Sequence, residues 1–140
     1  MDIELKNTQE RLKEITDTFN LFSDSIDVLS YLVDLGKKSH NLDEHDKNND
    51  NLISGCTSKA WVVVSNKKNN QYVVETDSDS HIVSGLLFLL SLTINYKSRE
   101  YIDKINPNEV LRSIGLEGNI TSQRTNGLIS AINTIKNKIS

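Results

Sequence analysis

The strongest constraint on the fold is the apolar stretch at residues 82–92, which follows four residues with capping side chains at 77–80, D-S-D-S. Asp and Ser side chains accept hydrogen bonds from the free N–H groups at the start of a helix, so the sequence predicts that a helix begins here. Its longest apolar run, residues 85–92, is far shorter than the roughly 20 residues that cross a bilayer. We therefore predict a buried helix and no membrane span.

A second apolar stripe predicts helices in the N-terminal part of the chain. Its members recur every three or four residues, as on one face of a helix: Leu12, Ile15, Phe19, Phe22, Ile26, Leu29 and Val33. Because Ser23 and Asp24 can cap a helix, we interpret the stripe as two helices, about 8–21 and 24–35, with Gly36 as the C-terminal stop. A single unbroken helix is the alternative.

Three further helices are indicated in the C-terminal part of the chain. Ser98 can begin a short one. Residues 106–109, N-P-N-E, place a capping asparagine before a proline at the first helical position, and Gly115 ends that helix. The segment 122–138 carries its leucine, alanine and isoleucine side chains on one stripe, so we expect it to close the domain as a helix.

Two β-branched and aromatic segments, 60–65 and 71–76, flank a polar turn and predict an antiparallel hairpin. We expect a third short strand around 52–53 or within 56–59. The segment 37–51, which joins the helices to the hairpin, is almost wholly polar and predicts a solvated loop, longer than a connection requires. The order of elements predicts an α+β fold, a small three-stranded antiparallel sheet packed on one side by several helices.

The composition excludes some classes of function. The 140 residues suit a single domain spanning 1–140, and the net charge of −3 comes without a basic stripe, so no nucleic-acid partner is expected. The N-terminus lacks the regions of a secretory signal, and a lone cysteine suits a reducing compartment. We expect a cytoplasmic protein, or an organellar one if a transit peptide has been removed.

The chain's one cysteine, Cys56, stands in the small and polar segment 53–58, I-S-G-C-T-S, just before a predicted strand. The reactive form of a cysteine is the thiolate, which hydrogen-bond donors and nearby positive charge favour, and a glycine-containing loop can offer backbone N–H groups. A lone cysteine is often only a small buried hydrophobe. Cys56 lies outside both the helical stripe and the valine-rich strand, which makes a reactive thiol an equal alternative.

Four separated blocks of the sequence resemble one known family. Residues 53–61, I-S-G-C-T-S-K-A-W, resemble the V-x-G-C-x-S-x-V-W signature of SufE-type sulfur acceptors. Residues 31–37 are similar to its Y-L-I-x-L-G-K block, and residues 78–86 to its S-D-A-x-I-V-x-G-L block. Residues 115–116 and 120–128 are similar to its G-L and L-S-x-x-R-x-N-G-L blocks. Four blocks in one order are far more specific than a single short motif.

The resemblance covers about residues 19–140, with three departures. Ser80 stands where the family usually has alanine, Thr121 stands where it has serine, and the asparagine-rich segment before Cys56 is unlike typical members. These departures bear on docking and leave the thiol chemistry untouched.

The resemblance implies a SufE/IscU-like fold and a sulfur carrier. Cys56 would take persulfide sulfur from a cysteine desulfurase of the SufS kind, stimulate that enzyme by removing its product, and pass the sulfur to an iron–sulfur scaffold complex. The chain would be a partner of the desulfurase and no stand-alone enzyme. Neither a cofactor nor a metal site is implied, and a homodimer is possible.

The residues beside Cys56 and the resemblance, which adds Asp79 and Arg124, together indicate the site residues. Cys56 is the catalytic residue, and five others have partner-binding or loop-supporting roles: Gly55, Thr57, Ser58, Asp79 and Arg124. We expect Asp79 to be at least a helix N-cap and Trp61 to pack in the core. The three histidines, His40, His45 and His81, predict neither a catalytic Cys–His pair nor a metal site.

Two other functions compete with the sulfur carrier. An iron–sulfur cluster scaffold of similar fold needs several thiolates or equivalent ligands, whereas this chain has one cysteine. A stand-alone thiol hydrolase needs a base beside the nucleophile, and none is evident in the sequence near Cys56.

Overall fold

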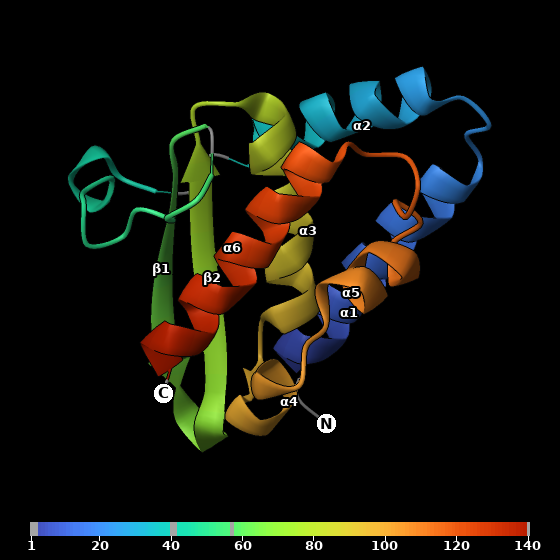
Figure 1. The fold of residues 1–140 in the computed structure, drawn as a ribbon. Coiled ribbons are helices and arrows are strands. Elements are labelled where there is room, and N and C mark those ends of the chain that lie inside the picture. The colour runs from blue at the N-terminus through green and yellow to red at the C-terminus, as the bar shows by residue number, and fades with distance from the viewer. Residues whose placement is uncertain (1–2, 40–41, 57, 140) are drawn as a thin grey trace.

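The computed structural model describes residues 3–39, 42–56 and 58–139. Within these ranges it contains the following elements: the helices α1 (Ile3–Asn20), α2 (Ser25–Lys38), α3 (His81–Ile94), α4 (Arg99–Asp103), α5 (Pro107–Ser113) and α6 (Ser122–Ile139), the strands β1 (Ala60–Lys67), β2 (Gln71–Ser78) and β3 (Lys97–Ser98), and the short 3₁₀ turns η1 (Glu44–Asp46) and η2 (Lys68–Asn70). The strands form one antiparallel sheet in the order β1-β2-β3. The predicted α+β class is confirmed (Figure 1).

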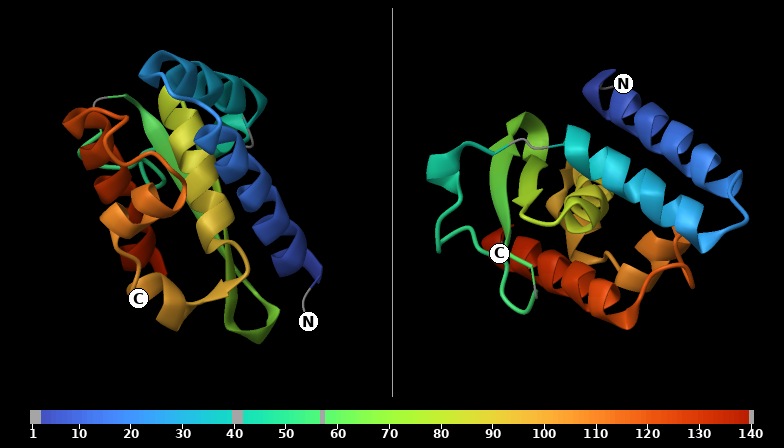
Figure 2. Two further views of the ribbon diagram at one scale, coloured as in Figure 1. Left: turned by 90° about the vertical axis from the view of Figure 1, so that its right-hand side faces the viewer. Right: turned by 90° about the horizontal axis from the view of Figure 1, so that it is seen from above.

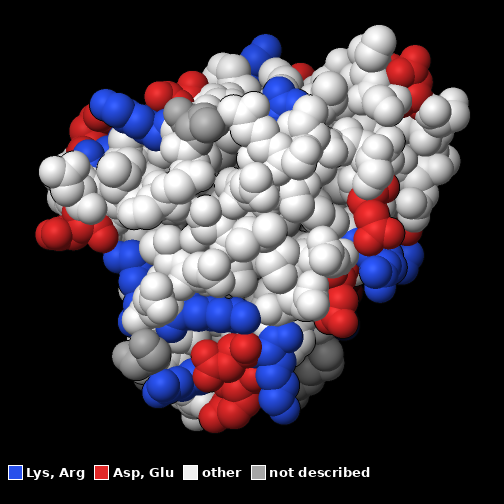
Figure 3. All heavy atoms as spheres, viewed as in Figure 1, with Lys and Arg blue, Asp and Glu red and all other residues white. Residues whose placement is uncertain are grey.

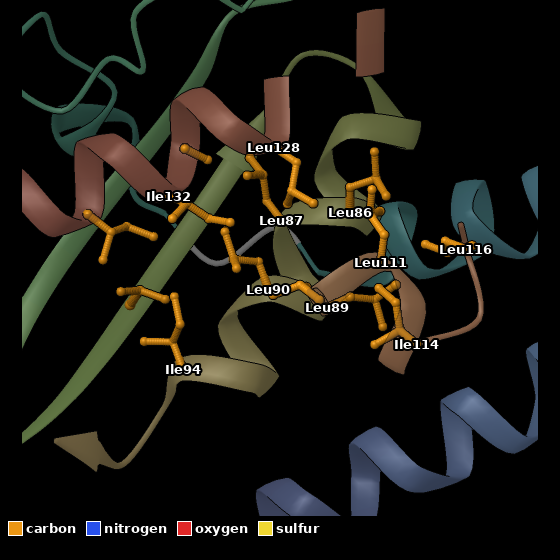
Figure 4. Close-up of a cluster of buried hydrophobic side chains, with 14 of the residues drawn as sticks. Leu86, Leu87, Leu89, Leu90, Ile94, Leu111, Ile114, Leu116, Leu128 and Ile132 are labelled. Atoms are coloured by element: carbon orange, nitrogen blue, oxygen red, sulfur yellow. The ribbon is translucent and has the colours of Figure 1, made fainter. Parts of the chain in front are cut away.

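Helix α3, predicted as the buried helix, is the centre of the fold. Viewed from above, it lies between the sheet on one side and α2 and α6 on the others (Figure 2). Its leucines pack against α5 and α6 in one continuous core, where Leu89 and Leu90 have no exposed surface (Figure 4). The core therefore forms around this one helix, and the remaining helices cover the sides of it that the sheet leaves open.

The third strand is not where the sequence predicted it. Leu52 makes only an isolated bridge to Trp61, whereas β3 pairs with the other edge of the sheet, at Gln71 and Tyr72. The chain reaches that edge directly after α3, where the Asn95 side chain accepts a hydrogen bond of 2.8 Å from the β2 backbone. A strand of two residues, Lys97–Ser98, is too short to show the alternation that identifies strands in a sequence.

The N-terminal stripe forms two helices, and the unbroken alternative is wrong. The Asp24 carboxylate accepts a hydrogen bond of 2.8 Å from the Ile26 N–H and caps α2. Gly36 does not end this helix, because α2 continues through it to Lys38. The predicted stop is therefore a position inside the helix.

Gly36 lies where α2 touches α3. A Cβ atom placed on Gly36 would lie 1.8 Å from the His81 carbonyl oxygen, and one on Gly85 would lie 2.3 Å from the Leu32 carbonyl oxygen. No side chain fits at either distance, so the two backbones approach as closely as glycine allows. This glycine crossing, Gly36 with Gly85, fixes α2 against the N-terminal half of α3.

Asp24→Ala is expected to lower the free energy of unfolding by about 1 kcal/mol, the usual effect of losing an N-cap carboxylate. Urea denaturation measures the change, with Asp34→Ala as the matched control because Asp34 is an exposed residue inside the same helix. The control is expected to keep or slightly raise stability, since alanine is the better helix former. Equal losses in the two variants would contradict the capping assignment.

The polar segment 42–51 is attached to one edge of the sheet. Lys47 Nζ lies 3.4 Å from Oδ2 of the buried Asp77 and 3.0 Å from Oε1 of Glu44, and it is 5.8 Å from the centre of the Trp61 ring. The hydrogen bond to Glu44 raises the pKa of Lys47 above its ordinary value, which keeps the ammonium charged. Trp61 is half-buried beneath this lysine and outside the buried core, so its predicted core role is wrong.

Candidate functional site

Cys56 lies in a loop, residues 54–59, that precedes β1 and is here called the cysteine loop. A backbone hydrogen bond of 2.8 Å from the Ile53 N–H to the Ala60 carbonyl closes the base of this loop. The Lys59 carbonyl accepts two more hydrogen bonds, from the Asp79 N–H at 3.0 Å and from the Ser78 hydroxyl at 2.8 Å. The cysteine loop is thus joined to the junction between β2 and α3.

The inner side of the cysteine loop packs against α6. Gly55 has a φ of +83°, and a Cβ on it would lie 2.9 Å from the Ser130 hydroxyl. A Cβ on Gly127 would lie 3.5 Å from Cys56 Sγ. Two consecutive residues of the loop therefore rest on one face of α6, and the positive φ at Gly55 turns the chain there at no steric cost.

The Cys56 side chain is half-buried and lines a pocket of about 250 Å³. The other lining residues come from the cysteine loop, α3 and the start of α6: Ser58, Ser80, Val83, Leu86, Leu87, Thr121, Gln123, Arg124, Gly127 and Leu128. The leucines among them are buried, whereas Thr121 and Gln123 are exposed. The pocket accordingly has an apolar floor and a polar mouth.

The floor of the pocket is continuous with the core. Leu128 of α6 lies beside Leu87 of α3, with Leu86 on the next part of that helix (Figure 4). These side chains also belong to the main hydrophobic cluster. The packed core thus extends to the pocket that Cys56 lines.

The structure brings three of the predicted site residues together. Cys56, Ser58 and Arg124 line the same pocket, and Gly55 forms the turn beside them. Thr57 lies outside the described residues. Arg124 stands in the first turn of α6, where its backbone N–H donates to the Thr121 hydroxyl at 3.4 Å.

Asp79 is placed differently from the prediction. Its side chain is exposed, and the N-cap of α3 is Ser80, whose hydroxyl accepts from the Val83 N–H at 3.4 Å. The Asp79 N–H donates instead to the Lys59 carbonyl of the cysteine loop, so Asp79 lies in the junction before the helix. Asp79 therefore contributes to the site through its backbone, and it is not among the residues that line the pocket.

Gly127 and the apolar floor were not predicted from the sequence. The leucines of the floor lie on helices whose stripes indicated only core packing, and no local pattern separates a core leucine from one that borders a pocket. Gly127 did carry a signal, because a glycine inside a helical pattern suggests a close approach by another group. Only the folded chain identifies that group as the thiol.

The face that carries the cysteine loop and α6 has few charges in its middle. In the space-filling view the central surface is formed by uncharged residues, while basic and acidic residues lie at its lower end and around its margins (Figure 3). The exposed residues that line the pocket include Thr121 and Gln123. A partner that binds here meets hydroxyl and amide groups at the mouth of the pocket.

One surface group has the spacing of a metal site. Within residues 3–39, 42–56 and 58–139, ligand atoms lie close enough to hold a metal ion only at Asp43, His45 and Asp46, a group that does not include Cys56. It lies on the surface of the segment before the hairpin, where clusters of acidic residues are common without a metal. In the same part of the chain, no helix has the length and apolar character required to cross a membrane.

Comparisons with known proteins show the family of the chain. The family model described as SufE, Fe-S metabolism associated domain, matches residues 13–139. An uncharacterized SufE-like protein of Rhizobium etli is 34% identical over 128 residues, which cover 89% of this chain and 86% of the relative. A second one, from Rhizobium meliloti, is 31% identical over 130 residues, with 91% and 93% covered.

A solved structure supports the fold. The solution structure of a hypothetical protein from Thermus thermophilus matches with a TM-score of 0.68 over 91% of this chain and 92% of the other, at 17% identity. At that identity the likeness concerns the fold alone. The family model and the two relatives, which cover nearly the whole chain and include the cysteine loop, establish that this protein belongs to the SufE family, whose domain is associated with iron–sulfur metabolism.

Proposed function

We propose that Cys56 accepts a sulfur atom from the persulfide of a cysteine desulfurase and carries it to iron–sulfur cluster assembly. The observation that supports this most is the position of the only thiol, half-buried at a pocket with an apolar floor and a polar mouth. Such a thiol is accessible to one docked partner, while the walls limit its contact with other solutes. The proposal places the protein in a reducing compartment such as the cytoplasm.

The transfer needs no oxidant or cofactor. The Cys56 thiolate attacks the outer sulfur of the desulfurase persulfide, and a new S–S bond forms at Cys56 as the old one breaks. The desulfurase cysteine leaves as a thiolate, and Cys56 holds the persulfide. Removal of the product sulfur frees the desulfurase for its next turnover, which accounts for stimulation.

The scaffold alternative has less support. A cluster scaffold requires several thiolates or equivalent ligands, and the chain has a single cysteine. The pocket residues that could substitute, Ser58 and Thr121 among them, carry hydroxyl groups, which are poor ligands for such clusters. No specific observation favours the scaffold role.

The test is to mix the protein with a cysteine desulfurase and cysteine, without reductant, and to measure its intact mass. We expect one added sulfur atom, located on the peptide that contains Cys56, together with faster turnover of the desulfurase. An unchanged mass combined with unchanged desulfurase activity would end the carrier proposal. As a control, the thiol is blocked by alkylation before the incubation. If the blocked protein still gains a sulfur atom, a residue other than Cys56 carries it, which would contradict the assignment.

Arg124 is proposed to contact the desulfurase at the mouth of the pocket. It is half-buried there, and arginines in such positions are common interface hot spots. Arg124→Ala is expected to lower the affinity for the desulfurase about tenfold, the effect of losing a contact of roughly 1.4 kcal/mol. Titration of the desulfurase stimulation measures this change.

The matched control for Arg124 is Arg112→Ala, because Arg112 is an exposed arginine on α5 that forms an ion pair with Glu117. This control is expected to leave stimulation unchanged. The rate at which Cys56 reacts with iodoacetamide is expected to be similar in both variants, which separates docking from thiol reactivity. Equal affinities for the two variants would contradict the contact assigned to Arg124.

A further inference from the structure

We propose that the missing side chain at Gly127 reserves room beside Cys56 Sγ for the outer sulfur of the persulfide, so that this glycine determines how well the loaded state is held. The inference rests on the proposed function, because it concerns the persulfide form of Cys56. It assigns Gly127 a positioning role within the pocket that the two residues line together.

At the other five positions the fold itself explains why the residue is glycine. Gly55, Gly115 and Gly118 have positive φ angles, which favour glycine. Gly36 and Gly85 each face a carbonyl oxygen of the neighbouring helix, at 1.8 Å and 2.3 Å from an added Cβ. Together with Gly127 these are all six glycines of the chain. Gly127 alone has neither feature, so the fold does not account for it.

Gly127 lies in the second turn of α6, inside a helix of 18 residues. Glycine at such a position destabilises a helix relative to alanine. The contact that an added Cβ would make is with Cys56 Sγ, at 3.5 Å, which is an ordinary van der Waals distance. The reduced protein would therefore accommodate alanine, and the reason that we propose for glycine concerns the persulfide state of the thiol.

The persulfide supplies such a state. Its S–S bond is about 2.05 Å long, so an outer sulfur that points from Sγ toward α6 would lie roughly 1.5 Å from an alanine Cβ, the difference between 3.5 and 2.05 Å. Non-bonded heavy atoms need about 3.5–4.0 Å. Alanine would thus exclude a wider range of orientations on the α6 side than glycine does, because the glycine Cα lies one bond farther from Sγ than that Cβ would.

The consequence concerns where the carried sulfur lies. Gly127 is next to Leu128, which belongs to the apolar floor of the pocket, whereas Gln123 and Arg124 one turn earlier belong to the mouth. With the α6 side closed, the outer sulfur is displaced away from this wall and toward the mouth, where solvent thiols reach it. The loaded state then decays faster, although the free thiol is unaffected.

Gly127→Ala tests this inference, with Asn133→Ala as the matched control because Asn133 is an exposed residue of the same helix. Both proteins are loaded with a desulfurase and cysteine and followed by intact mass, before and after addition of a small thiol reductant. We expect the wild type and the control to load equally. For Gly127→Ala we expect several-fold lower persulfide occupancy and a several-fold shorter half-life in reductant.

Two further measurements distinguish an effect on the persulfide from an effect on folding or on the reactivity of the free thiol. The thermal midpoint of Gly127→Ala is expected to equal or exceed that of the wild type, and its iodoacetamide reaction rate is expected to be unchanged. A lowered midpoint, or a persulfide as abundant and long-lived as in the wild type, would overturn the inference. If the wild type takes no sulfur from the desulfurase, the proposed function fails, and loading with cysteine persulfide as a small donor still tests Gly127.

Discussion

Cys56→Ser is expected to keep the fold and lose sulfur acceptance completely. The hydroxyl group differs from the thiol by one atom and occupies the same half-buried position at the pocket, so the packing of the loop on Gly127 changes little. A serine oxygen forms no persulfide under these conditions, and the chain has no second cysteine to replace it. Intact mass after incubation with a desulfurase and cysteine measures the loss.

The same variant separates two ways of stimulating a desulfurase. Because the pocket mouth, including Arg124, is unchanged, Cys56→Ser is expected to bind the desulfurase with an affinity near that of the wild type. It is expected not to stimulate turnover, since it cannot remove the product sulfur. Stimulation by the serine variant would instead indicate that docking alone activates the enzyme, and the carrier role would need another basis.

Gly36→Ala is expected to be the most destabilising addition of a single methyl group in the chain. The new Cβ would overlap the His81 carbonyl oxygen, at 1.8 Å, and the atom in its way belongs to backbone that cannot rotate aside. Helices α2 and α3 must separate, so we expect a loss of about 4 kcal/mol or more in the free energy of unfolding. Against a typical total of about 5–15 kcal/mol, much of the protein's stability is lost.

Gly118→Ala is the control for that experiment. Gly118 has a φ of +82° with open space around its Cβ position, so alanine there adds backbone strain without a collision, at about 1 kcal/mol. Urea denaturation of both variants gives the comparison. A Gly36→Ala loss no larger than the Gly118→Ala loss would contradict the glycine crossing.

The glycine crossing also bears on the site. Helix α3 supplies Leu86 and Leu87 to the pocket floor, and Gly85, directly before them, touches α2. A shift of α3 away from α2 therefore moves the floor relative to Cys56. Gly36→Ala protein that remains folded is expected to show altered alkylation kinetics at Cys56, although Gly36 is not among the residues that line the pocket.

Local signals predicted most of the elements. Asp24, Ser98 and Asn106 cap the helices that their sequence contexts indicated, because a capping side chain acts within three residues of itself. The hairpin predicted from two β-branched segments around a polar turn was found, with strands that each run two residues beyond the predicted ends, to Lys67 and Ser78. The small and polar residues around Cys56 indicated a loop before the hairpin, and Cys56 lies in such a loop before β1.

The wrong predictions concern positions where the local sequence is compatible with two different local structures. A glycine near the end of a helical stripe is compatible with a C-cap and with a close helix crossing. Gly36 lies at a close helix crossing. Asp79 and Ser80 are both capping residue types, and in the structure Ser80 caps the helix while the backbone N–H of Asp79 donates to the distant Lys59 carbonyl. Such contacts join residues far apart in the sequence, so no window of neighbouring residues contains them.

The closed base of the cysteine loop limits how far its sulfur can travel. Cys56 is three residues from Ile53, which is held by the hydrogen bond to Ala60, and three extended residues span at most about 10 Å. This protein thus has no long swinging arm. Under the proposed function, a donor and a recipient of the sulfur would each have to bring a reactive group to the same small opening. The two would then bind in turn, and unloading would begin only after the donor has left.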